Sequence, residues 1–241
     1  GNTVKLTEQR NDDNDMTTQI LANYMNTFGK HDINAMVSYE DFYYFNESLT
    51  ASRDQYEVDN FPYLDAGPST YRDNSGTAYE NSRRSYFGRI AYGYDGRYLI
   101  QANVRRDASS RFHRDHRWGT FPSVSAGWVI SQEKFMRDAQ SWVSFLKLRA
   151  SYGQLGNERI GNYPYISLLD YTNSVMYNQL TDSEAAYYKG IAQIQYAIQD
   201  ISWETTESYD IGIDLRMFNN RFSLTADYYR KNTKGMLLDL E

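Results

Sequence analysis

The chain has 241 residues, a formal net charge of −6 and no cysteine. The missing thiols exclude disulfide bridges and cysteine-based metal centres, and the acidic balance argues against a general nucleic-acid-binding protein. The length suits one large domain or part of a bigger one.

Alternation of apolar and polar residues predicts a series of β-strands. A first strand near 17–28 is less regular than those that follow. The clear strands are expected at 33–45, 86–94, 98–106, 121–130, 145–152, 209–217 and 222–230. No segment has a convincing helical period, although 131–139 can form a turn or two with Ser131 as its N-cap.

Two residue pairs predict tight hairpins between neighbouring strands. Asp95-Gly96 lies between 86–94 and 98–106, and an Asp-Gly pair suits a type I′ turn, which needs positive φ at both central positions. Asn219-Asn220 separates 209–217 from 222–230, and asparagine also tolerates positive φ. Both pairs of strands are therefore expected to be antiparallel neighbours. Ile90 and Tyr92 are expected to share a face with the apolar residues of 98–104.

The links between the predicted strands alternate in length along the chain. Short links fall near Gly29-Lys30, at Asp95-Gly96, across 131–143 and at Asn219-Asn220; long polar links fall at 47–83, 107–117 and 155–202. In an up-and-down sheet this order puts every short turn at one end and every long link at the other. Transmembrane β-barrels have that asymmetry, whereas a soluble sandwich with Greek-key links has no reason to keep it.

The composition agrees with either kind of β-protein. Aromatic residues make up 16% of the chain, with 23 tyrosines, and such an excess suits long strands, sugar-stacking surfaces or the interfacial girdles of membrane barrels. No run of 18 apolar residues is present, which excludes a transmembrane helix but not a barrel. The oily face of the strands therefore meets either lipid or the core of a soluble fold.

The candidate reactive residues have simple structural interpretations. His113 and His116 have the spacing of a metal pair, but they lie in an arginine-rich segment without a third ligand. Carboxylate pairs such as Glu204/Glu207 or Asp210/Asp214 suggest glycosidase chemistry, yet carboxylates on alternate strand positions usually form a solvated face. Known nucleophile and phosphate-binding motifs are absent from the sequence. We therefore expect no catalytic residue, metal or cofactor.

A set of polar residues is the candidate functional surface. They alternate with the apolar positions of the predicted strands and carry both signs of charge, so they would line a watery lumen in a barrel or face solvent in an open sheet. The residues are Gln101, Asn103, Arg105, Arg149, Asp214, Arg216 and Asp227.

Three long segments resemble one family of bacterial proteins. They are 85–135, LKLRASYGQLGNERIGNYPY at 146–165, and WETTESYDIGIDLRMFNNRFSLTADYYRKNTKGML at 203–237. All three resemble the TonB-dependent outer-membrane transporters of the SusC/RagA type from Bacteroidetes. The resemblance implies an all-β antiparallel meander that is a segment of a 22-stranded transmembrane barrel. It also implies import of oligosaccharides or peptides with a SusD-like surface lipoprotein, energised through TonB.

The chain is expected to be only part of such a transporter. Residues 1–241 read as part of the barrel domain, the N-terminal plug and the TonB box are absent, and about eight strands can be counted. The expected surroundings are outer-membrane lipid, the lipoprotein, TonB through the missing part, and the substrate, but no nucleic acid. Two other functions stay open on the residues alone: a soluble β-rich carbohydrate-binding module, and a β-fold glycoside hydrolase.

Overall fold

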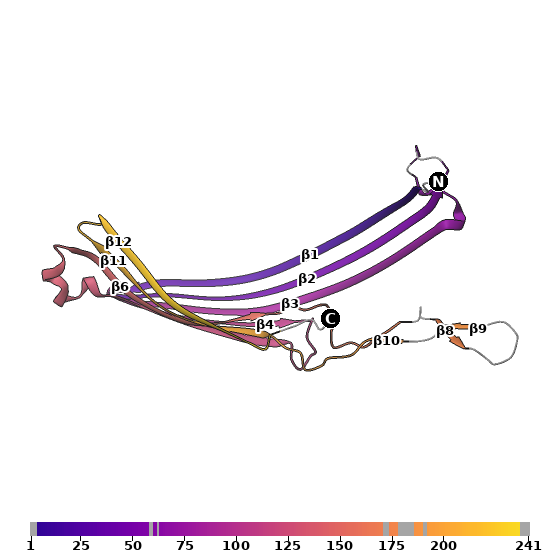
Figure 1. Cartoon of the computed structure of the whole chain (residues 1–241). Coiled ribbons are helices and arrows are strands. Elements are labelled where there is room, and N and C mark those ends of the chain that lie inside the picture. The colour runs from indigo at the N-terminus through magenta and orange to yellow at the C-terminus, as the bar shows by residue number, and fades with distance from the viewer. Residues whose placement is uncertain are drawn as a thin grey trace. The chain divides into compact units, whose positions relative to one another are not determined.

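The computed structural model describes residues 4–57, 60–61, 63–170, 174–177, 186–189 and 192–236. Eight strands form one antiparallel up-and-down sheet in the order β1-β2-β3-β4-β5-β6-β11-β12 (Figure 1). Their bounds are β1 Val4–Phe28, β2 His31–Tyr56, β3 Arg72–Tyr94, β4 Tyr98–Ser109, β5 Trp118–Val129, β6 Val143–Asn157, β11 Glu204–Met217 and β12 Phe222–Lys234. The predicted all-β fold class is confirmed.

The minor elements lie in the links. Four short strands form two separate two-stranded pairs: β7 Leu168–Asp170 with β10 Ala192–Gln195, and β8 Ser174–Tyr177 with β9 Ala186–Lys189. The helices are 3-10 turns: η1 Leu64–Ala66, η2 Ser69–Tyr71, η3 Ile130–Gln132 and η4 Lys134–Ala139. Among the described helices, none has the length and hydrophobicity that a membrane span requires.

The chain divides into two compact units. One comprises residues 1–18 and 41–83, and the other comprises 19–40 and 84–241. The first unit contains the polar halves of β1, β2 and β3. The second contains the remaining strands and every predicted site residue.

The first unit corrects the predicted length of the first strands. β1 begins at Val4 rather than near 17, and most of the expected long link 47–83 belongs to β2 and β3, so only 57–71 connects them. Polar side chains bridge the strands: the Tyr44 hydroxyl donates to Asp13 at 2.5 Å, and the Tyr43 hydroxyl donates to Glu80 at 2.7 Å. A strand with polar residues on both faces shows no alternation, and the pattern that reveals strands elsewhere is therefore missing here.

The two predicted hairpins are confirmed. Asp95 and Gly96 both have positive φ, at 54° and 66°, and the Arg97 amide donates to the Tyr94 carbonyl at 3.0 Å. Asn219 and Asn220 also have positive φ, at 53° and 64°, between strands that pair from Thr205↔Lys234 to Met217↔Phe222. The predicted helical turn at 131–139 is only partly correct, because Ser131 lies inside η3 and caps no helix by its side chain.

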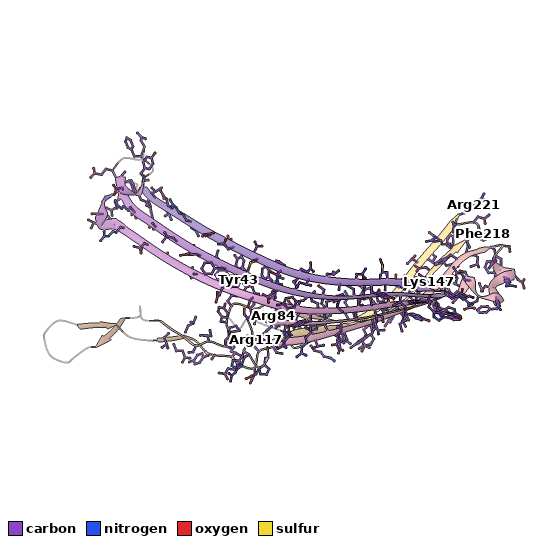
Figure 2. The ribbon with its side chains drawn as sticks, turned by 180° about the vertical axis from the view of Figure 1, so that it is seen from behind. Tyr43, Arg84, Arg117, Lys147, Phe218 and Arg221 are labelled. Carbon is purple, nitrogen blue, oxygen red and sulfur yellow. The ribbon has the colours of Figure 1, made fainter. Side chains whose placement is uncertain are left out.

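Neighbouring short turns are joined by backbone hydrogen bonds. The Asp95 amide donates to the Lys30 carbonyl at 2.7 Å, the Val129 amide to the Arg97 carbonyl at 2.8 Å, and the Phe218 amide to the Trp142 carbonyl at 2.8 Å. Figure 2 shows Phe218 and Arg221 together at this end of the second unit, away from Arg117. The short turns therefore gather at one end of this unit, as the link lengths predicted.

An anionic side chain is enclosed at the same end. Glu133 is 9% exposed and accepts hydrogen bonds from the Tyr98 hydroxyl at 2.5 Å, the Trp128 indole at 3.1 Å and Arg97 Nη1 at 2.8 Å. The hydrogen bond from Tyr98, then that from Trp128, and the charge of Arg97 lower the pKa of Glu133 against the opposing effect of burial. The Glu133 carboxylate thereby joins its own link to the start of β4 and to the end of β5.

Acid is expected to weaken this junction. Because the folded pKa of Glu133 is lowered, its stabilising effect is complete above the unfolded value of about 4.3 and is lost as the pH falls through the folded value. Unfolding midpoints in guanidinium, measured for the intact protein in detergent between about pH 6 and pH 3, should fall with pH more steeply in the wild type than in Glu133→Gln. Equal pH slopes would show that the carboxylate contributes no such linkage.

The opposite end of the second unit contains an aromatic core. Phe112, in the 110–117 link, is fully buried and packs on Trp203 with ring centroids 5.2 Å apart, while Trp203 packs edge-on against Phe121 at 5.4 Å. The Phe121 ring occupies the space that a Cβ on Gly156 would need. The Trp203 indole donates to the Arg117 carbonyl at 3.0 Å. This core fastens two of the long links to each other.

Candidate functional site

The strand register places all seven predicted site residues on one face of the sheet. Directly opposed residues of neighbouring strands share a face. One cross-strand row joins Gln101, Ser125, Ser151, Asp210 and Tyr229, and the next joins Leu99, Gly127, Arg149, Gly212 and Asp227. Asn103, Arg105, Asp214 and Arg216 lie at even spacings from these rows. We call this side of the second unit the polar face.

The other side of these strands carries apolar and aromatic residues, and we call it the apolar face. Its residues remain accessible; for example, Ile211 is 64% and Tyr228 74% exposed. Tyr94 stacks on Tyr98 with centroids 6.4 Å apart, which places alternate β3 residues on this face as predicted. Its residues on β3 to β12 are Ile90, Tyr92, Tyr98, Ile100, Ala102, Val104, Val124, Ala126, Trp128, Leu148, Ala150, Ile211, Ile213, Leu215, Leu224, Ala226 and Tyr228.

Three of the predicted residues form one ionic network on the polar face. Arg149 Nε donates to Asp214 Oδ2 at 2.8 Å, and its Nη2 donates to Asp227 Oδ1 at 2.9 Å. The Thr225 hydroxyl donates to Asp214 Oδ1 at 3.1 Å. The guanidinium thus joins β6 to both β11 and β12. Both carboxylates pair with the same guanidinium, so Arg149 is fully engaged within the network.

Gly212 makes this arrangement possible. It lies on β11 directly between Arg149 and Asp227, and a Cβ there would overlap the Asp227 carboxylate and Arg149 Nη2. A glycine inside a strand often marks such a close approach. The ion pair therefore crosses over the β11 backbone rather than passing beside it.

Gly212→Ala is expected to break the crossing ion pair. The added methyl group forces Arg149 and Asp227 apart, and overpacking of this kind costs about 1–3 kcal/mol. The free energy of unfolding of the intact protein should fall by that amount. Gly161→Ala serves as the control, because no atom lies within 4 Å of its Cβ position; equal effects of the two substitutions would contradict the assignment.

The other four residues lie outside this ionic network on the polar face. The Asn103 amide donates to the Ser123 hydroxyl at 3.1 Å, and the Gln101 amide donates to Asn103 at 3.4 Å. Arg105 pairs with Asp107 at 2.8 Å. The guanidinium of Arg216 lies 5.2 Å above the Phe145 ring, two rows nearer the short turns than Arg149. The seven predicted residues are thus spread over the polar face and do not form one compact site.

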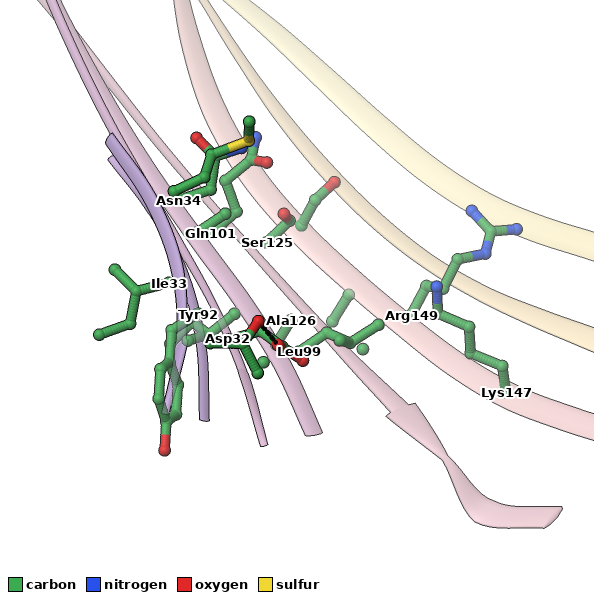
Figure 3. A pocket seen from close by; sticks show the side chains of 18 of the residues that line it. Asp32, Ile33, Asn34, Tyr92, Leu99, Gln101, Ser125, Ala126, Lys147 and Arg149 are labelled. Carbon is green, nitrogen blue, oxygen red and sulfur yellow. Dashed lines mark hydrogen bonds between the residues drawn. The ribbon is translucent and has the colours of Figure 1, made fainter. Parts of the chain in front are cut away.

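A hollow of about 720 Å³ opens along the second unit, and its lining combines polar-face residues with apolar-face residues such as Ile100, Ala126 and Ala150. Lys147 and Arg149 project from one of its sides and Asp32 and Asn34 lie at the other, with Ser125 between them (Figure 3). Sequence reasoning missed Lys147, Asp32 and Asn34, although each lies on the polar parity of its strand. The hollow offers amides, hydroxyls and charges of both signs, which suits polar solutes rather than metal ions.

The reactive-site candidates are not assembled into a catalytic site in the described part of the chain. No group of three or more His, Asp or Glu side chains suited to a metal ion occurs among the described residues. His116 faces Asp200 at 3.8 Å, and Glu207 accepts from Lys234 at 2.9 Å. Asp214 is held by Arg149. These contacts are structural.

Comparison with known proteins decides the family. The family model described as TonB dependent receptor-like, beta-barrel, matches residues 2–241. The chain belongs to this family of TonB-dependent receptors. Its members are proteins of the Gram-negative outer membrane, and the chain is an outer-membrane protein.

Named relatives cover most of the chain. TonB-dependent receptor P39 of Formosa agariphila is 33% identical over 228 residues, which are 94% of this chain and 21% of that protein. TonB-dependent receptor SusC of Bacteroides thetaiotaomicron is 29% identical over 223 residues, 92% of this chain and 21% of that protein. The solved structure of the RagAB peptide transporter matches with a TM-score of 0.83 and 30% identity, over 97% of this chain and 25% of that one. The chain thus spans about a fifth of the length of these curated relatives.

Proposed function

We propose that the chain forms part of the barrel wall of an active nutrient importer, with its polar face toward the lumen and its apolar face toward lipid. The separation of residue types by the strand register carries this proposal. Over the part of the strands nearer the short turns, ionic and amide side chains gather on one parity of β4, β5, β6, β11 and β12, and the opposite parity contains apolar and aromatic residues. Toward the long links this opposite parity also carries the Glu207–Lys234 ion pair. Membrane barrels show this division of faces.

The resemblance to named relatives supports a substrate class. SusC is a TonB-dependent receptor, and the RagAB structure is that of a peptide transporter. We infer that the solute is an oligosaccharide or a peptide, delivered by a SusD-like surface lipoprotein, and that import is energised through TonB. Residues 1–241 would be part of a 22-stranded barrel domain, and the plug and the TonB box would come from residues outside this segment.

Catalysis is not part of the proposed function. The relatives that match are receptors and transporters rather than enzymes. Two carboxylates of the polar face, Asp214 and Asp227, are engaged in ion pairs with Arg149. These contacts support a role in lining a passage for polar solutes rather than in hydrolysing a glycosidic bond.

Cysteine labelling tests the two faces directly. Ser125 and Ala126 are neighbours on β5 and belong to opposite faces. This segment has no cysteine of its own, so single Ser125→Cys and Ala126→Cys variants can be made in the intact protein after any cysteines elsewhere are replaced. A hydrophilic, membrane-impermeant maleimide should label Ser125→Cys in the outer membrane and leave Ala126→Cys largely unlabelled.

A second measurement addresses import itself. Uptake of labelled oligosaccharide or peptide by cells that carry the intact protein should stop when the proton gradient is collapsed. The importing solute should also protect Ser125→Cys from the maleimide. Equal labelling of both cysteines would reject the lumen assignment, and uptake that survives an uncoupler would reject energised import.

A further inference from the structure

A cluster of rings and guanidinium groups lies on the apolar face, at the end of β4 nearest the long links. Tyr39 and Tyr86 pack with centroids 5.4 Å apart, and Tyr86 stacks on Trp118 at 5.9 Å. The guanidinium of Arg106 lies 5.1 Å from the Trp118 ring centre, and that of Arg84 lies 6.0 Å from the Tyr39 ring centre. Tyr86 and Trp118 are 48% and 41% exposed.

The cluster lies where the apolar stretch of β4 ends, on the side of the long links. The apolar-face residues of this strand run from Tyr98 through Ile100 and Val104, and the next position on that face is Arg106. Arg106 forms no ion pair with any residue that the structure describes. Amphipathic rings and arginines at such a level are typical of a membrane interface, where lipid headgroups lie.

A second feature lies deeper on the same face. A pit of about 610 Å³ is floored by Ala126 and Ala150, which oppose each other on β5 and β6. Its walls include Ile100, Trp128 and Ile211. Tyr92, Tyr98 and Leu148 of the apolar face also line it, together with Leu99, Gly127 and Arg149, which belong to the polar parity of their strands.

The distance between the aromatic–arginine cluster and the pit allows one elongated molecule to contact both. Ile100 and Arg106 lie on the same strand and the same face, six positions apart, and at ~3.4 Å per residue the guanidinium lies about 20 Å along the strand from the pit. An anion-binding group above an apolar recess matches a lipid with a phosphorylated headgroup and a long acyl chain. Arginine is well suited to phosphate because its donors match the oxygen geometry.

We propose that the apolar face binds a phosphorylated lipid of the outer leaflet. Its phosphate contacts Arg106 beside Trp118, and one acyl chain runs down β4 into the pit between β4 and β6. The phosphate-binding part of the site lies away from the residues that line the hollow of the polar face, and the bound lipid serves to fix the protein in its leaflet.

Native mass spectrometry of the intact protein in detergent tests the site. The probes are diphosphorylated lipid A and the same lipid without its phosphates. Arg106→Gln should weaken retention of the diphosphorylated lipid about fivefold, since one arginine near a charged lipid surface contributes about that factor. The dephosphorylated lipid should bind the wild type about as weakly. Arg114→Gln, which removes an exposed arginine of the 110–117 link, is the matched control and should retain the lipid.

A variant of the pit separates a lipid from a free anion. Ala150→Leu fills the floor without changing charge, and it should lower lipid retention at least as much as Arg106→Gln. Equal retention by Arg106→Gln and Arg114→Gln would overturn the proposal. So would unchanged retention by Ala150→Leu, or displacement of the lipid by millimolar inorganic phosphate, because either result would reduce the site to a simple anion contact.

Discussion

Ile213→Asp is expected to prevent assembly of the intact protein in the outer membrane. Ile213 lies in the middle of the apolar stretch of β11, with Tyr209 and Ile211 on one side and Leu215 and Met217 on the other. A charge on the lipid face near the bilayer centre costs up to about 2–4 kcal/mol. The amount of folded, heat-modifiable protein in outer-membrane fractions should therefore fall sharply.

Arg216→Asp on the same strand is the matched control. Arg216 belongs to the polar face and is exposed, so an aspartate there stays in a watery environment. This variant should reach the membrane at close to the wild-type level. If both substitutions reduce assembly equally, the assignment of the apolar face to lipid is wrong.

Phe112→Ala is expected to release the long links from each other. Phe112 is fully buried against Trp203, and loss of a buried phenylalanine costs about 3–5 kcal/mol. Hydrogen exchange and protease cleavage within 110–117 and 196–203 should accelerate strongly, whereas exchange in the paired strands β4 and β5 should change little.

Phe135→Ala supplies the comparison for this result. Phe135 lies in η4 at the opposite end of the second unit and is 67% exposed, so its removal leaves no cavity. Exchange in the long links should then match the wild type. A uniform loss of protection over all strands in Phe112→Ala would mean that the aromatic core stabilises the whole sheet rather than the links.

The faces of the strands could be predicted because the side-chain period of a strand is two. Gln101 and Asn103 alternate with Ile100 and Ala102, and the hairpin at Asp95-Gly96 sets how the neighbours align. That information suffices to place the seven polar residues on one side of the sheet, as the register now shows.

The partners of those residues could not be predicted in the same way. The ion pair from Arg149 to Asp227 joins positions 78 residues apart and depends on the alignment of three strands and on the absence of a side chain at Gly212. The sequence shows a glycine at position 212, but it does not show which side chains of the adjacent strands approach that glycine. The outer ends of β1, β2 and β3 were missed because both of their faces are polar there, which removes the alternation.

The hydrogen bonds between neighbouring short turns have a consequence for the register of the strands. A one-residue slip between two strands would move the apolar side chains of a hairpin to the polar face of the sheet. The Asp95 amide meets the Lys30 carbonyl, and the Phe218 amide meets the Trp142 carbonyl, only when successive hairpins are aligned as seen. These hydrogen bonds at the turns therefore stabilise the observed register between successive hairpins.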